Sequence, residues 1–183
     1  MDILKLIKKD HDEAFAIIEK LEHMTDKPSS AADKLTLELV TEVILHAKSE
    51  EEGLYESIEG AKEEFKDFVL EGVIVHSLVE NTLMRLLETK PGGNGEFKAA
   101  LEVTKELLEH HAKEEEEKIL FPKITKNFSN EERAEMGQLM LSAKKKLRPK
   151  VEKMIVELKD SKNKVPQEAM KKKTAKFKES RIH

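Results

Sequence analysis

One seven-residue segment of the chain occurs twice, and this repeat constrains the fold more than any other feature. Residues 46–52 (HAKSEEE) return 65 residues later as residues 111–117 (HAKEEEE), with six of the seven positions identical. The same spacing relates His11 to His76. An internal repeat indicates that one structural unit is used twice. The sequence therefore predicts two copies of one hairpin, each with a histidine followed by a His-x-x-x-Glu pair.

Apolar residues in both copies recur every three or four positions, which is typical of amphipathic helices. The chain has only seven Gly and five Pro, too few for the many turns of a sandwich or barrel. Turn-forming residues gather at 26–30 and 90–95. We expect helices over residues 2–24, 31–59, 61–89, 96–126 and about 130–160. The predicted fold is all-α, an up-down-up-down four-helix bundle with an additional C-terminal helix.

Charge is distributed unevenly along the chain. The formal net charge is −4, but residues 161–183 hold eight basic and two acidic residues. We expect residues 1–160 to form the bundle with its fifth helix, and residues 161–183 to form a basic, flexible tail. Phe177 is the only aromatic residue of this tail, whereas nucleic-acid binding favours several aromatics. We therefore expect no nucleic-acid partner.

Composition excludes several kinds of site. The chain has no cysteine, which removes disulfides, thiolate zinc sites and iron–sulfur clusters. No run approaches the ~20 apolar residues that span a bilayer, and charges follow Met1 at once, without the apolar stretch of a signal peptide. We expect a cytoplasmic protein that does not enter a membrane.

The repeated His-x-x-x-Glu pairs suggest a metal centre. Residues four apart share a helix face, with Cβ atoms about 5–6 Å apart, so His46 with Glu50 and His111 with Glu115 can each address one centre. A buried glutamate is costly unless a cation neutralises it. Taken singly, such a histidine is more often a core residue and such a glutamate a solvated one. Their common placement by the repeat favours metal binding, and imidazole with carboxylate suits iron, manganese or zinc.

The ordered pattern of His, His-x-x-x-Glu, His, His-x-x-x-Glu resembles the hemerythrin-like, HHE cation-binding family over residues 2–125. The resemblance implies a non-haem diiron site bridged by two carboxylates and an oxo or hydroxo group. It gives the bridging roles to Glu50 and Glu115. The terminal ligands that it implies are the histidines His11, His46, His76 and His111.

The chain departs from the oxygen-carrying hemerythrins at two places. Those proteins have His-x-x-x-His on the third helix and His-x-x-x-x-Asp on the fourth. Here Glu80 stands four residues after His76, in the place of the second histidine, so Glu80 is left as a candidate for an additional carboxylate ligand. His110 is a second open ligand, one residue out of phase with His111. His23 lies about 18 Å beyond His11 along a continuous helix, which predicts a helix-end histidine outside the site.

The expected function is that of a diiron protein that binds or senses oxygen, nitric oxide or iron, with any signal passed to a separate protein partner. Two alternatives stay open. One is turnover, as a diiron oxidase or in the removal of peroxide or nitric oxide. The other is a protein-interaction module that metal merely stabilises.

Overall fold

The computed structural model describes residues 1–93 and 95–163, and throughout these residues the only regular structure is helical. Residues 1–151 form one compact unit, and the described residues after it, 152–163, belong to a second. The helix α7 (Asn130–Asn163) begins in the first unit and extends into the second. The predicted all-α fold with an additional C-terminal helix is confirmed.

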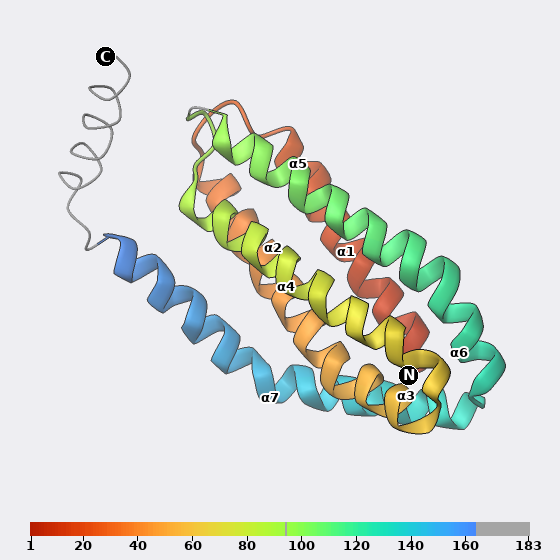
Figure 1. The fold of residues 1–183 in the computed structure, drawn as a ribbon. Coiled ribbons are helices and arrows are strands. Elements are labelled where there is room, and N and C mark those ends of the chain that lie inside the picture. Colours follow the sequence, from red (N-terminus) through yellow and green to blue (C-terminus); the bar gives the residue numbers. More distant parts are fainter. Residues whose placement is uncertain (94, 164–183) are drawn as a thin grey trace, which may run out of the picture. The chain divides into compact units, whose positions relative to one another are not determined.

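Four antiparallel rods build the first unit. They are α1 (Ile3–Glu22), α2 (Ser30–Glu50), α4 (Lys66–Glu88), and a continuous rod of α5 (Glu96–Leu108), η3 (Glu109–Leu120) and α6 (Phe121–Asn127). Figure 1 shows these rods side by side, from the red α1 to the green α5. α1 and α4 each pack against both α2 and α5, which closes the ring of four. Short connections between successive rods give the up-down-up-down order.

Serine caps begin two of the helices where the sequence indicates a cap. The Ala32 amide donates to Oγ of Ser29 over 3.0 Å at the start of α2. At the start of α7, the Glu132 amide donates to Oγ of Ser129 and the Ser129 amide donates to Oε2 of Glu132, over 3.2 and 2.7 Å. This reciprocal pair is a capping box, which satisfies donors that a helix N-terminus leaves free.

The second hairpin begins later than the sequence suggests. After α2 the chain continues through η1 (Glu51–Tyr55) and α3 (Glu56–Ala61), so Gly60 is helical. The direction changes at Lys62, whose backbone is extended, before the short η2 (Glu63–Phe65) leads into α4. The predicted break at Gly60 is therefore displaced by two residues, because Gly60 has no positive φ and continues the helix to Ala61.

Two stretches of π-helix follow or contain the repeated segments, and the sequence did not predict them. η1 covers five residues directly after Glu50, and η3 covers twelve residues around His111. A π-helix bonds residue i to i+5 in place of i+4, and it is frequent at functional sites. The local register of side chains along both segments therefore differs from that of an α-helix.

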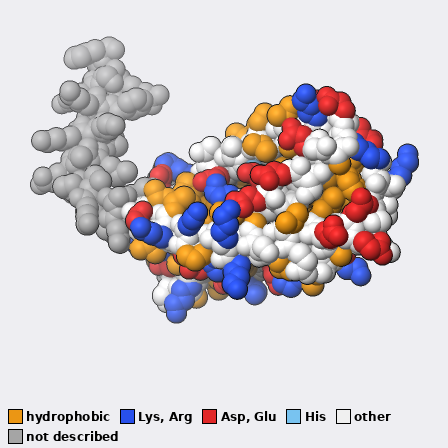
Figure 2. Space-filling view, turned by 90° about the horizontal axis from the view of Figure 1, so that it is seen from below, with side chains coloured by type: hydrophobic (Ala, Val, Ile, Leu, Met, Phe, Trp, Pro, Cys, Tyr) orange, Lys and Arg blue, Asp and Glu red, His pale blue; other side chains and the backbone are white. Residues whose placement is uncertain are grey.

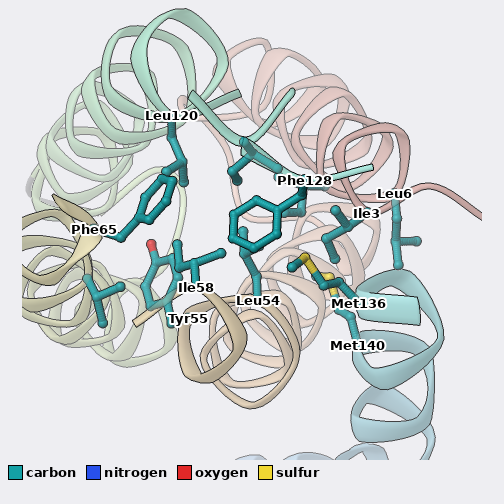
Figure 3. Packing of buried hydrophobic residues seen from close by; sticks show 13 residues of the cluster. Ile3, Leu6, Leu54, Tyr55, Ile58, Phe65, Leu120, Phe128, Met136 and Met140 are labelled. Atoms are coloured by element: carbon teal, nitrogen blue, oxygen red, sulfur yellow. The ribbon is translucent and has the colours of Figure 1, made fainter. Parts of the chain in front are cut away.

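An apolar cluster fills one end of the bundle, as Figure 3 shows. Leu54 and Tyr55 of η1 lie there beside Phe65, and Met136 and Met140 join them from α7. A side-chain carbon at Gly53 would lie 2.7 Å from the Met140 backbone, so the glycine allows α7 to approach closely. The first turns of α7 thus belong to the core of the compact unit.

One face of the molecule carries charged side chains of both signs (Figure 2). Figure 2 shows acidic and basic side chains interleaved over the face that it presents, with apolar groups between them.

The predicted boundary at residue 160 falls inside α7, which continues to Asn163. The rest of the predicted basic tail, residues 164–183, lies outside the described residues.

Candidate metal centre

Four of the seven histidines meet in the middle of the bundle, one from each rod. His11 comes from α1, His46 from α2, His76 from α4 and His111 from η3, and all four are at most 8% exposed. The His11 and His46 rings lie 5.0 Å apart, and the His76 and His111 rings 4.8 Å apart. Nε2 of His76 lies 3.0 Å from Nε2 of His111. The histidines that the repeat singled out therefore share one location.

Two carboxylates reach the same location and are completely buried. Oε2 of Glu50 lies 3.5 Å from Nε2 of His46 and 3.6 Å from Nε2 of His76. Oε2 of Glu116 lies 3.0 Å from Nε2 of His11, and its Oε1 lies 3.3 Å from Nε2 of His111. Each carboxylate thus faces one histidine from each hairpin.

The structure brings Glu116 into the cluster in the place predicted for Glu115. Both residues lie in η3, where the π-helical bonding brings the residue five after His111 onto the face of His111. Glu115 turns toward the rim, with Oε2 at 2.8 Å from Nδ1 of His111 and Oε1 at 3.1 Å from Nε2 of His110. The histidines therefore repeat at an offset of 65, whereas the converging glutamates, Glu50 and Glu116, repeat at 66.

A signal for Glu116 was present in the sequence. The oxygen-carrying hemerythrins place their fourth-helix carboxylate five residues after the histidine, and Glu116 stands five residues after His111. The internal repeat pointed to Glu115, because the first copy uses the α-helical spacing of His46 and Glu50. The other five predicted ligands converge in the structure.

The converging groups divide into two sets that share one glutamate. We call the set of Glu50, His76, His111 and Glu116 site A, and the set of His11, His46 and Glu116 site B. Within each set, ligand atoms lie within 4.8 Å of one another, so each could hold a metal ion. Because Glu116 belongs to both, its two oxygens are placed to bind two neighbouring cations.

In each of the four histidines, the outer N–H group, at Nδ1, donates a hydrogen bond to a carboxylate, because an ionised carboxylate can only accept. Nδ1 of His46 lies 2.9 Å from Asp10, Nδ1 of His11 3.1 Å from Glu117, Nδ1 of His76 2.8 Å from Glu51, and Nδ1 of His111 2.8 Å from Glu115. Such partners fix the ring orientation and leave the electron pair of Nε2 free to bind a metal. All four Nε2 atoms therefore face inward as metal ligands do.

Several inward-facing atoms of this cluster are buried without a hydrogen-bond partner. They are both carboxylate oxygens of Glu50, Oε2 of Glu116, and Nε2 of His11 and His46. Buried polar groups are nearly always paired, and an unpaired buried charge is costly. A cation among these atoms removes the cost at once. The donor set therefore fits a metal, and imidazole with carboxylate suits iron, manganese or zinc.

The electrostatics of the metal-free cluster agree with this interpretation. The pKa of Glu50 is raised well above its ordinary value, mainly by burial and next by repulsion from Glu116. Burial lowers the pKa of His46 to about 4 despite the hydrogen bond to Asp10, so its imidazole is neutral at physiological pH. A neutral imidazole is the form that binds a metal.

A family comparison decides the wider assignment. The hemerythrin HHE cation-binding domain matches residues 2–124, about two thirds of the chain. The chain belongs to this family. No curated protein and no solved structure matches the chain. The matched residues of the HHE domain include sites A and B, and the match ends before α7 begins.

A small cavity adjoins the metal centre of the HHE domain. Its volume is about 40 Å³, and all four clustered histidines line it together with apolar side chains such as Val43, Val79 and Leu108. A cavity of this size holds one or two water-sized molecules. The small volume and the largely apolar wall suit a small ligand.

The side chains that the sequence left open as ligands lie outside the centre. Glu80 pairs with Lys48, with Oε2 at 3.2 Å from Nζ, and is about one third exposed. His110 is 65% exposed and faces Glu115. His23 ends α1 as its C-terminal cap, as predicted for a helix-end histidine.

Tyr55 lies closer to the HHE centre than the sequence indicated. Its hydroxyl donates to Oε1 of Glu116 over 3.1 Å, and its ring stacks on His76 at 5.5 Å. Burial, with the nearby Glu50 and Glu116, raises the pKa of the phenol well above its usual value, so the proton stays on the hydroxyl. Nothing in the spacing of Tyr55 along the sequence distinguishes it from an aromatic residue of the core. No helix among residues 1–93 and 95–163 is long and apolar enough to cross a membrane.

Proposed function

We propose that this HHE domain holds a pair of iron ions through sites A and B and binds a small diatomic molecule, oxygen or nitric oxide, beside them. The unpaired, buried oxygens of Glu50 and Glu116 carry the proposal, since buried carboxylate oxygens without a hydrogen-bond partner are costly and a bound cation would satisfy them. Glu116 belongs to both sites, and Glu50 lies between His46 and His76. Both carboxylates are thus suited to bridging roles.

The residues around the pair have distinct tasks in this proposal. Iron, when bound, supplies redox chemistry and coordination positions for the diatomic ligand. The four histidines bind through Nε2, and the carboxylates behind them keep each ring turned inward. Tyr55 holds a proton at its hydroxyl, 3.1 Å from Oε1 of Glu116. The apolar walls at Val43 and Val79 exclude bulk water from the cavity.

Metal analysis of protein purified without oxygen tests this function. We expect about two iron ions per chain, as in other bundles with paired carboxylate sites, and a visible absorbance band on admitting air that disappears when oxygen is removed. His46→Ala or His111→Ala should lose at least about half of the iron, because each removes a ligand. His23→Ala, far from the centre, is the matched control and should retain it.

Other results would favour the alternative functions. Many turnovers of peroxide or nitric oxide per chain would favour a detoxifying enzyme. A spectroscopically silent zinc protein that binds a partner equally well with and without iron would favour an interaction module. Equal iron in the His46→Ala, His111→Ala and His23→Ala proteins would contradict the proposed centre.

A further inference from the structure

Site B is backed by a lysine from the fifth helix. Lys144 of α7 contacts Oδ2 of Asp10, the same oxygen that accepts the proton of His46 Nδ1. Both side chains are largely buried, with 15% of Lys144 and 10% of Asp10 exposed. Water screens a buried charge weakly, so this ammonium acts on the centre with little attenuation.

The second carboxylate behind site B is also held by lysines. Nζ of Lys113 lies 2.6 Å from Oε1 of Glu117, the oxygen that faces His11, and Nζ of Lys8 lies 3.3 Å from Oε2. These two lysines are more exposed than Lys144, with 36% and 50% of their side chains accessible. The charges of Lys113 and Lys8 therefore act on site B more weakly than that of Lys144, but they add positive charge in the same way.

Site A lacks this positive charge. Glu51 and Glu115 orient its histidines, and across residues 1–93 and 95–163 neither carboxylate forms an ion pair with a lysine or an arginine. His110 faces Glu115, but it is 65% exposed and is largely screened by water.

These differences have a direct effect on metal binding. A carboxylate that accepts a proton from a ligating histidine raises the basicity of that ligand. An ammonium on the same carboxylate oxygen withdraws electron density from the carboxylate and so lowers the basicity of the histidine. It also repels the bound cation. We infer that the two metal positions are unequal, with site A binding a divalent cation tightly and site B binding it more weakly, and that Lys144 of α7 sets the difference. The inference rests on the proposed metal centre.

Two further ion pairs hold this part of α7 in place. Arg148 makes two contacts with Glu42 of α2, at 2.6 and 2.9 Å, and Nζ of Lys146 lies 3.1 Å from Oε2 of Glu52. Both residues follow Lys144 along α7, and the two contacts of Arg148 hold this stretch of the helix against α2, the helix that carries His46. α7 lies beyond the residues that match the HHE family. Lys144 is thus a positioning residue that this chain adds to the HHE centre.

Stepwise titration of the metal-free protein with Co²⁺ tests the inference. We expect two binding steps by calorimetry at about pH 8, where histidine side chains are largely uncharged. Lys144→Met should tighten the second step about tenfold and leave the first nearly unchanged, since a repulsive buried charge is removed. A residue that merely supported the fold would weaken binding when it was lost. Lys144→Arg keeps the charge and should behave as the unaltered protein does.

Lys146→Met is the matched control, because it removes a charge and an ion pair from α7 at a carboxylate that orients no ligand. It should leave both steps unchanged. His46→Ala should abolish the weaker step and His111→Ala the tighter one. Circular dichroism checks that each variant keeps its helices.

The outcomes separate the inference from the proposed function. Two equal steps, a reversed assignment of the histidine variants, or a Lys144→Met protein whose second step is unchanged or weaker would overturn the inference alone. An unaltered protein that binds no Co²⁺ in the cluster would overturn the proposed function as well.

Discussion

Glu116→Gln is expected to remove most of the bound metal, whereas Glu115→Gln keeps most of it. The glutamine has nearly the same volume but no charge, and Glu116 is the carboxylate that sites A and B share. Its loss weakens both positions together. Glu115 instead orients His111 from the rim. Loss of such an orienting partner typically reduces metal affinity by about 10–100-fold, which a saturating supply of metal overcomes.

Elemental analysis of the two variants, each reconstituted with excess iron and then desalted, measures this difference. We expect less than about half of the unaltered iron content in Glu116→Gln, because a shared ligand is lost. A matched helical content by circular dichroism is the control for folding. If Glu115→Gln loses as much iron as Glu116→Gln or more, the π-helical register of η3 does not hold in the loaded protein.

Removal of the metal is expected to lower the melting temperature by about 10 °C. A ligand that binds only the folded state at about a thousand times its Kd stabilises that state by roughly 4 kcal/mol. For a chain of this size each kcal/mol corresponds to about 2–4 °C. The metal-free chain also retains the buried carboxylates of Glu50 and Glu116 without a cation. Thermal unfolding before and after chelation measures the change.

The double variant Glu50→Gln/Glu116→Gln is the control for this second prediction. It replaces two of the carboxylate ligands with glutamine at nearly the same volume, so the variant should bind little metal. The chelator should not change its melting temperature. Equal melting temperatures for the loaded and metal-free unaltered protein would show that no cation balances the charge of the cluster.

The helical architecture was predictable because its determinants are local. The period of apolar residues identified each rod, and serines before two of the helices, Ser29 and Ser129, cap them through contacts within three residues. The convergence of His46 and His111 followed from the internal repeat, since equivalent residues of two hairpins reach the same depth in a bundle. Because a helix buries one whole face, its apolar residues recur every three or four positions, which the sequence shows directly.

The exact ligand set was harder to predict, because it depends on the π-helical turns of η3. No residue type marks the change from i+4 to i+5 bonding, and the repeat favoured Glu115 over Glu116 for that reason. The carboxylates behind the histidines were also missed as a group. Their pairing depends on contacts between rods, such as that of Asp10 on α1 with His46 on α2. The contact of Lys144 with Asp10 joins residues 134 positions apart and has no local signal.

The most direct test of the central claim is a crystal structure of the iron-loaded protein with anomalous diffraction at the iron absorption edge. We predict two anomalous peaks inside the bundle, one at site A and one at site B, with Glu116 contacting both and Glu115 still bonded to Nδ1 of His111. A single peak on the outer surface, or two peaks ligated by Glu115 with Glu116 turned away, would contradict the account.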